Sequence, residues 1–226
     1  MVFSPLHVFW FVCAIGSGLI SKNLGVEIIN TGTDFYQELE GAATKPKKEV
    51  FDLAIKGHQK LIEDNLLTNK NILSIIDMSL PSTKKRFWTI NIGERRIISH
   101  SLVAHGKNTG DNTATTFSNR SGSHQTSLGF YATGQTYYGK HGYSLYLDGL
   151  EKGINNLARE RSIVIHGASY VSAEFINKYG RLGRSFGCPA LPKEESKAII
   201  DLIKDGSCLF IYFPKEAYFE QSIFFN

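Results

Sequence analysis

The spacing of apolar residues changes along the chain and divides it into two parts. Up to Lys70 the apolar residues recur every three or four positions, as they do on one face of a helix. Val50, Ala54 and Leu61 form one such stripe. His58 lies on the same stripe, so it is interpreted as a packed side chain and not as a ligand.

The helix that carries this stripe is predicted to open at Pro46. A proline suits the first turn of a helix, because the N–H that it lacks needs no partner there. A shorter helix is predicted from the capping pair Thr33-Asp34 through Glu40. Residues 22–70 therefore form a helical lead-in in which no chemistry is visible.

From residue 71 the pattern becomes that of β-strands. Short runs of β-branched and aromatic residues are separated by turns that contain glycine. The predicted strands are 72–77, 86–92, 96–103, 128–131, 143–147, 163–165 and 208–213. The second and third form a hairpin around Gly93-Glu94, and the polar stretch 106–125 is a long loop.

Two helices are predicted among these strands. Ser172 suits the N-cap of the first and Gly180 its C-terminal stop. The second starts at Pro192-Lys193 and runs through Lys204, with Ala198, Ile199, Leu202 and Ile203 on its inner face. The fold class is therefore mainly β with peripheral helices (α+β), and we expect a β-sandwich around one core.

The first 21 residues differ in composition from the rest. Residues 5–20 are nearly all apolar and uncharged, and small residues follow the densest part, as in a secretory signal. No basic residue precedes Lys22, so an uncleaved membrane anchor is the second interpretation and a buried first helix the third. The predicted organisation is a signal peptide or anchor over 1–21, the lead-in over 22–70 and one catalytic domain over 71–226.

Composition narrows the class of protein only a little. With 226 residues, of which 42% are hydrophobic, the chain can bury one sizeable core. The net charge of +4 is small and scattered, which argues against nucleic acid as a partner.

The stretch 163–191 holds the residues that suggest chemistry. An apolar strand leads directly to His166-Gly167, and a lone cysteine, Cys188, follows in a glycine-flanked turn. A thiol nucleophile needs a base and backbone N–H groups that hold a developing oxyanion. His166 supplies the base, and the N–H groups of Gly187 and Cys188 suit the oxyanion. The pattern predicts a cysteine acyl-transfer site.

These motifs resemble the murein L,D-transpeptidase catalytic domain family (YkuD-like). The resemblance rests on His166-Gly167, on Ser185-x-Gly187-Cys188 and on the GRSxGCPA pattern over 183–190. Segments 75–82, 127–131, 136–145 and 147–150 extend it, so that it covers about 73–213. The chain departs from many members at Phe186, where they carry a second histidine.

The resemblance implies a reaction and roles for these residues. Cys188 would form a thioester from a peptidoglycan stem tetrapeptide and release D-Ala, and an amine acceptor would resolve it. His166 would be the base, and the carbonyl of Gly167 would orient its ring. The implied mechanism needs no metal and no organic cofactor. It also implies an exported, periplasmic or cell-envelope protein whose partners are peptidoglycan stem peptides.

Several further residues have two interpretations. Arg184 binds a substrate carboxylate or forms a structural salt bridge. Ser185 steadies the turn and is also a candidate for substrate binding. A cluster of aromatic and polar groups lines the substrate or belongs to a half-buried sheet face; its members are Tyr137, Tyr138, His141 and Tyr143. Of these, Tyr138 and Tyr143 are the substrate-binding candidates, and His141 is assigned no proton transfer.

The cysteines also leave alternatives. Once Cys13 has left with the signal, Cys188 and Cys208 either form a disulfide or stay free. Because Cys208 lies in an apolar strand, we favour a buried Cys208 and a free, reactive Cys188.

Three other functions remain open. An L,D-carboxypeptidase would use water as the acceptor, and a wall-binding module would hold a dead site. A zinc–thiolate site is the least favoured of the three, because Cys188 lacks further ligands at the spacing of zinc sites.

Overall fold

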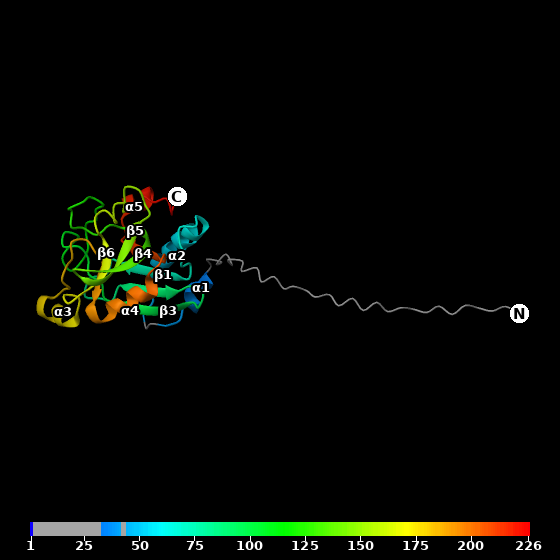
Figure 1. Cartoon of the computed structure of the whole chain (residues 1–226), viewed down its shortest axis with the longest axis horizontal. Coiled ribbons are helices and arrows are strands. Elements are labelled where there is room, and N and C mark those ends of the chain that lie inside the picture. Colours follow the sequence, from blue (N-terminus) through cyan, green and yellow to red (C-terminus); the bar gives the residue numbers. More distant parts are fainter. Residues whose placement is uncertain (2–32, 42–43) are drawn as a thin grey trace. The chain divides into compact units, whose positions relative to one another are not determined.

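The computed structural model of the protein describes Met1 and residues 33–41 and 44–226. The described residues from 33 onward form one compact unit (Figure 1). The predicted signal peptide or anchor, including Cys13, lies outside the described residues. Within the described part of the chain, no helix is both long enough and apolar enough to cross a membrane.

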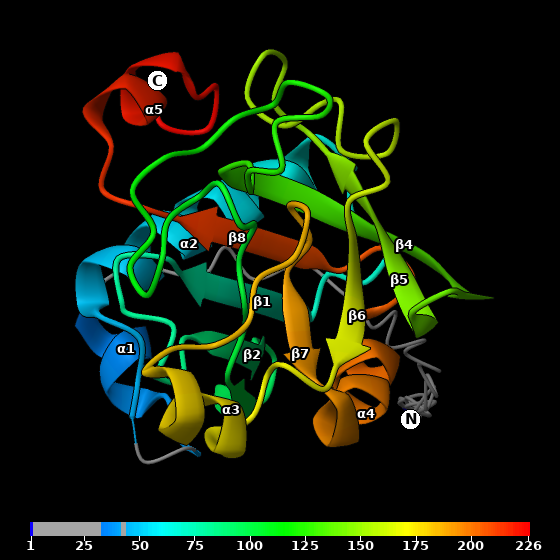
Figure 2. The same cartoon turned by 90° about the vertical axis from the view of Figure 1, so that its left-hand side faces the viewer.

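Eight strands form a single mixed sheet in the order β3-β2-β1-β8-β4-β5-β6-β7. Their bounds are β1 Ile72–Asp77, β2 Phe87–Asn91, β3 Arg96–Ser101, β4 Gly129–Gly139, β5 Gly142–Gly149, β6 Val164–Ala168, β7 Ala190–Pro192 and β8 Cys208–Tyr212. In Figure 2, β1 and β8 lie roughly horizontally and β6 and β7 roughly vertically, so the strand direction rotates across this sheet. The mainly β fold with peripheral helices is confirmed.

The sheet contains the parallel pair β1 and β8, with β8 at its middle. Every residue of β1 is buried, and its apolar run pairs with β2 on one side and β8 on the other. Cys208 opens β8 and is fully buried. Both Cys208 and Cys188 are free, which confirms the predicted absence of a disulfide between them, while the reactivity of Cys188 stays a prediction.

The hairpin of β4 and β5 is longer than predicted. Tyr137 and Tyr138, which were expected between two short strands, belong to β4. Gly134 does not end the strand, because the ladder shifts register between Thr133 and Thr136. A Cβ at Gly134 would lie 3.1 Å from the Cβ of Tyr146. Gly134 thus allows β4 and β5 to approach each other closely inside the hairpin, whereas the sequence pattern suggested that it lies between two strands.

The two ends of the sheet are joined beyond the regular strands. Ala104, which follows β3, exchanges two backbone hydrogen bonds of 2.8 and 3.4 Å with Ala190 of β7. A small apolar cluster lies at this junction and consists of Ala104, Ala168, Val171, Leu182 and Ala190. The junction therefore fixes β7, and with it the turn before β7, to the β2–β3 hairpin.

Among the residues that the structure describes, five helices surround the sheet: α1 Thr33–Glu38, α2 Lys48–Glu63, α3 Ala173–Tyr179, α4 Lys193–Ile203 and α5 Glu216–Gln221. Helix α2 contacts β1 and β8 through the predicted stripe, and His58 is fully buried there. Burial lowers the pKa of His58 to about 4. The helix starts at Lys48, two residues after Pro46, so that the predicted place of Pro46 in the first turn is wrong.

The capping predictions for α3 are confirmed, whereas the inner face of α4 differs from the prediction. The Ser172 hydroxyl accepts a hydrogen bond from the N–H of Phe175, and Gly180 ends α3 at φ 71°. The buried face of α4 is Ser196, Ile199, Ile200 and Ile203, while Ala198 and Leu202 are exposed. The helix is turned because Ser196 fits against Gly167 of β6, where a Cβ would lie 2.4 Å from the Ser196 Oγ.

A buried carboxyl group fixes the C-terminal segment. Glu151 is 1% exposed, and its oxygens accept hydrogen bonds from the Phe130 N–H (2.7 Å), the Tyr218 hydroxyl (3.1 Å) and the Ser222 hydroxyl (2.5 Å). Burial raises the pKa of Glu151 above its ordinary value of 4.5, although these donors oppose the shift. One side chain thus joins β4 to α5 and the residue that follows it.

This buried group should make the stability depend on pH. Because the folded state holds the Glu151 proton more tightly than the unfolded state does, the free energy of unfolding should fall as the pH rises above 4.5. In Glu151→Gln this contribution should disappear, so the decline should become shallower. Urea denaturation over a pH series measures it. Glu94→Gln, which changes an exposed carboxylate, serves as the control and should keep the wild-type pH dependence. Parallel curves for wild type and Glu151→Gln would contradict the assignment.

Candidate active site

Cys188 lies at the end of a turn that its own side chains hold closed. The Ser185 hydroxyl donates to the carbonyl of Cys188 at 2.6 Å and accepts from the N–H of Gly187 at 3.1 Å. Gly187 has φ 128°, in the region that favours glycine, and a Cβ there would lie 2.9 Å from the Gln125 carbonyl. The prediction that Ser185 steadies the turn agrees with this geometry.

The thiol of Cys188 rests against the start of β6. Its Sγ lies 3.5 Å from the N–H of Val164 and 3.6 Å from the carbonyl of Ser162. Burial raises the pKa of the Cys188 thiol, and the Val164 N–H, the charge of Arg161 and the charge of Lys140 oppose that rise. The carbonyl of Ser162 can accept the proton of a thiol, whereas the Val164 N–H favours a thiolate.

His166 lies in the middle of β6, two residues beyond Val164, and is 2% exposed. Its Nδ1 lies 3.1 Å from the carbonyl of Gly167. A carbonyl only accepts, so Nδ1 carries the proton and Nε2 is left to accept one. Burial lowers the pKa of His166, with Lys140 and His141 acting in the same direction, so the ring is neutral near pH 7.

The sheet register brings the end of the Cys188 turn beside the strand of His166. His166 is directly opposite Ala190, the first residue of β7, and Cys188 precedes Ala190 by two residues. In the described part of the chain, the hydrogen-bond partners of the thiol are backbone groups of β6 and the turn before it.

A second histidine ring covers His166. His141, in the tight turn between β4 and β5, stacks on His166 with ring centroids 4.4 Å apart and planes 23° apart. This contact joins two segments that are 25 positions apart, and no sequence pattern pointed to it. Phe186, which stands where many family members carry a second histidine, does not cover His166. Its ring is 64% exposed and contacts His124 and Lys107.

The predicted oxyanion donors differ in their surroundings. The N–H of Gly187 donates to Ser185, so an oxyanion would have to compete with that hydroxyl. The N–H of Cys188 faces its own thiol, where it acts to lower the thiol pKa. Their role as an oxyanion hole stays a prediction.

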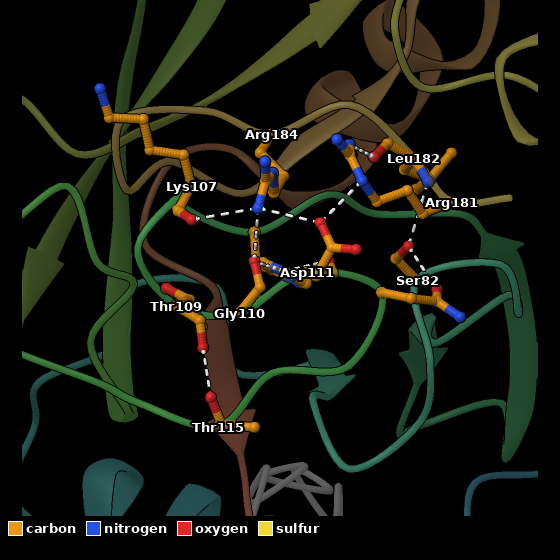
Figure 3. Close-up of polar contacts among 11 residues, drawn as sticks. Ser82, Lys107, Thr109, Gly110, Asp111, Thr115, Arg181, Leu182 and Arg184 are labelled. Carbon is orange, nitrogen blue, oxygen red and sulfur yellow. Dashed lines mark hydrogen bonds and ion pairs between the residues drawn. The ribbon is translucent and has the colours of Figure 1, made fainter. Parts of the chain in front are cut away.

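Arg184 takes part in a structural network on the loop opposite the turn (Figure 3). Its Nη1 lies 3.1 Å from a carboxylate oxygen of Asp111 and 3.0 Å from the carbonyl of Gly110, and Arg181 reaches the same Asp111 oxygen at 2.8 Å. Asp111 is exposed, so these ion pairs contribute little to stability by themselves, but they fix the loop relative to the turn. The role of Arg184 in substrate binding stays a prediction.

Beneath this loop lies a buried pair of basic side chains. Arg86 donates to Nδ1 of His105 at 2.7 Å, and Nε2 of His105 lies 3.1 Å from the carbonyl of Asp111. Burial and the neighbouring Arg86 lower the pKa of His105 to about 4, so the ring is neutral and can accept from the guanidinium. His105 therefore supports the loop from below.

The tyrosines around the site differ from the predicted pair. Tyr138 is 78% exposed at the end of β4, and the hydroxyl of Tyr143 donates to Asp201 of α4 at 2.7 Å. Tyr137 and Tyr170 instead interact electrostatically with Cys188, and burial raises the pKa of Tyr170 to about 12. Substrate lining by Tyr137, Tyr138 and Tyr143 stays a prediction, and Tyr170 is the tyrosine near the thiol that sequence reasoning missed.

Comparisons with known proteins point to one family. The model of the L,D-transpeptidase catalytic domain matches residues 42–212, which is more than half of the chain. A comparison with curated proteins finds no match.

Solved structures of similar proteins are distant in sequence. An L,D-transpeptidase from Mycobacterium smegmatis is 12% identical, with 63% of this chain and 59% of that chain covered and a TM-score of 0.39. The helical cell shape determining protein Pgp2 from Campylobacter jejuni is 16% identical, with 64% and 48% covered and a TM-score of 0.41. An L,D-transpeptidase from Xylanimonas cellulosilytica is 12% identical, with 79% and 89% covered and a TM-score of 0.37. The chain thus spans less than two thirds of the first two proteins.

The turn around Cys188 should depend on the Ser185 hydroxyl. Ser185→Ala removes the acceptor of the Gly187 N–H and the donor to the Cys188 carbonyl, both in a buried place. The free energy of unfolding should fall by about 1–3 kcal/mol, as measured by chemical denaturation. Ser121→Ala, at an exposed position of the polar loop 106–125, should change it by less than about 0.5 kcal/mol. An equal effect of both substitutions would show that the hydroxyl does not hold the turn.

Proposed function

Because the chain belongs to the L,D-transpeptidase catalytic domain family, we propose that it is an exported cysteine acyltransferase of peptidoglycan. Its substrate is a stem tetrapeptide, and its acceptor is an amine on a second stem. One observation carries the proposal: a free, half-buried thiol in a rigid glycine turn rests against the strand that carries a neutral histidine. The apolar segment 5–20 supports export, with the first 21 residues as signal peptide or membrane anchor.

Nε2 of His166 takes the proton of the Cys188 thiol, while the Gly167 carbonyl holds the opposite side of the ring. The thiolate attacks the carbonyl carbon of the bond between the third residue and D-Ala. When the tetrahedral intermediate collapses, the C–N bond breaks, His166 returns the proton to the leaving amine, and a thioester remains. The acceptor amine then attacks the thioester, loses a proton to His166, and the sulfur leaves as the thiol.

The resting position of the thiol adds one step to this sequence. Sγ lies against the carbonyl of Ser162 and the N–H of Val164, two residues before the histidine on β6. The thiol proton must therefore leave the Ser162 carbonyl before Nε2 can accept it. Contacts of this kind are often long in a free enzyme and shorten when substrate binds.

The proposal predicts an acyl-enzyme on Cys188. When the mature protein is incubated with purified disaccharide-tetrapeptide, intact mass spectrometry should show an adduct that corresponds to loss of D-Ala, together with a cross-linked dimer. Cys188→Ala should form neither. Adduct formation without dimer but with tripeptide would assign water as the acceptor and so an L,D-carboxypeptidase. Folded protein with a free thiol and neither adduct nor product would contradict the proposed function and favour a dead site.

Removing the base should abolish turnover and leave the fold intact. General-base catalysis is worth roughly 10²–10⁴-fold, so His166→Ala should lose at least about a hundredfold in the rate of D-Ala release. Ser121→Ala serves as the matched surface control and should keep the wild-type rate. A melting curve tests whether the His166→Ala protein is folded. If folded His166→Ala keeps activity within about tenfold of wild type, another group is the base.

A further inference from the structure

Arg161 lies at the end of the segment that leads into β6 and joins two parts of the site. Its guanidinium donates four hydrogen bonds to residues 118–127, which are the last part of the polar loop and the two residues after it. The acceptors are the Ser118 carbonyl (2.9 Å), the Ser127 hydroxyl (2.5 Å), the Ser123 hydroxyl (3.3 Å) and the Gln125 carbonyl (2.7 Å). No other arginine in the described part of the chain donates to four residues of a single loop.

The same guanidinium lies beside the turn that holds Cys188. A Cβ on Gly187 would be 3.5 Å from its Nη2 and 2.9 Å from the Gln125 carbonyl that Nη2 binds. The next residue, Ser162, has φ 55°, which is uncommon for a residue with a side chain. That turn of the backbone directs the Ser162 carbonyl to the Cys188 thiol. Arg161 therefore adjoins the turn on one side and the contact of the resting thiol on the other.

All four acceptors of Arg161 are neutral oxygens. In residues 33–41 and 44–226, none of the ion pairs within 4.0 Å includes Arg161. A half-buried charge without a counter-charge costs free energy. Burial lowers the pKa of Arg161, and the neighbouring Tyr131 and Cys188 are the groups whose negative charge would raise it. Because Tyr131 stays protonated in its buried place, the thiolate of Cys188 is the anion that remains.

We propose that Arg161 is a positioning residue that holds a fixed cation beside Cys188, so that the thiolate forms next to a counter-charge already in place. Its four hydrogen bonds keep the guanidinium there and tie the loop over 118–127 to the turn. The inference rests on the proposed role of Cys188 as the nucleophile. It adds an electrostatic partner that no motif contains and that acts together with His166, the proton acceptor.

The neighbouring Arg159 is a natural contrast. It lies two residues earlier, and its guanidinium forms a bidentate pair with Asp148 at 2.7 Å for both bonds. Its charge is compensated on the surface and is not available to the thiol. Substitutions of the two arginines therefore distinguish the loss of any positive charge in this region from the loss of the charge beside Cys188.

The experiment measures the reactivity of the thiol and needs no substrate. The rate at which iodoacetamide alkylates Cys188 is followed from about pH 6 to about pH 11.5, because the thiol pKa is raised, with peptide mapping to identify the cysteine. Only a thiolate reacts, so the midpoint of the curve reports the pKa of the thiol. Cys208, which is fully buried, should stay unmodified in folded protein. Removing a nearby cation disfavours the thiolate, so Arg161→Gln should move the midpoint up by about one pH unit.

Two controls separate charge from order in the loop. Arg159→Gln should leave the midpoint unchanged. Ser127→Ala removes the shortest contact of Arg161 but keeps its charge, so it should increase hydrogen exchange in the loop without moving the midpoint. If Ser127→Ala and Arg161→Gln shift the midpoint equally, the effect runs through loop order and the proposal is wrong. An unchanged midpoint in Arg161→Gln also overturns it.

If Arg161→Gln does not fold, Arg161→Lys carries the test. A lysine keeps the charge and loses the fork of donors, so the midpoint should stay within about 0.3 pH units of wild type while hydrogen exchange in the loop increases. A shift of a full unit in Arg161→Lys would overturn the proposal. Because alkylation requires no peptidoglycan, a shifted midpoint in a protein that forms no acyl-enzyme would contradict the proposed function but would still show that Arg161 supplies the counter-charge of the thiolate.

Discussion

The parallel pairing of β6 with β7 decides where each candidate catalytic group lies. β7 has only three residues, and its pairing with β6 places the end of the cysteine turn beside the strand of His166. The turn could not hold this position alone. A pair made of a five-residue strand, β6, and a three-residue strand, β7, needs contacts from the rest of the fold to be stable. The support comes from the backbone contact of Ala104 with Ala190 and from α4, which fits against Gly167. The chemistry thus depends on a pairing that the rest of the fold keeps in place.

The electrostatic surroundings of the thiol come from separate elements. Burial favours the neutral thiol, and the charges of Arg161 and Lys140 and the N–H of Val164 favour the thiolate. His166 is neutral for the same reason that the thiol is protonated, namely burial. A neutral base next to a protonated thiol is the pair of states from which proton transfer can begin. Partial burial and a few fixed charges therefore set the protonation states of these two groups.

Local patterns in the sequence predicted local structure well. The strand 72–77 has the bounds that its apolar run indicated, and the caps of α3 at Ser172 and Gly180 are those that residue type favours. Such features depend on neighbours within a few positions. The buried face of α4 was predicted with Ala198 and Leu202, and it differs because a contact with a distant glycine turns the helix. Spacing along one helix carries no information about that partner.

The candidate site shows the same limit. The motif order indicated Cys188 and His166, because a nucleophile turn and a histidine after a strand are recognisable by themselves. Nothing local marks Arg161, whose acceptors lie 34 to 43 positions earlier in the chain, or the stacking of His141 on His166. Charges and ring contacts between distant segments follow from the closed sheet, and only the fold brings them together.

The junction of Ala104 with Ala190 also limits how a substrate can be recognised. Many proteins that cleave or join peptides bind an extended chain along the free edge of a sheet, where main-chain hydrogen bonds accept almost any sequence. At Ala190 both backbone groups already serve Ala104. A peptide that approaches Cys188 therefore has no strand edge to extend at this residue. Any selectivity among peptides at this place must come from side chains and loops.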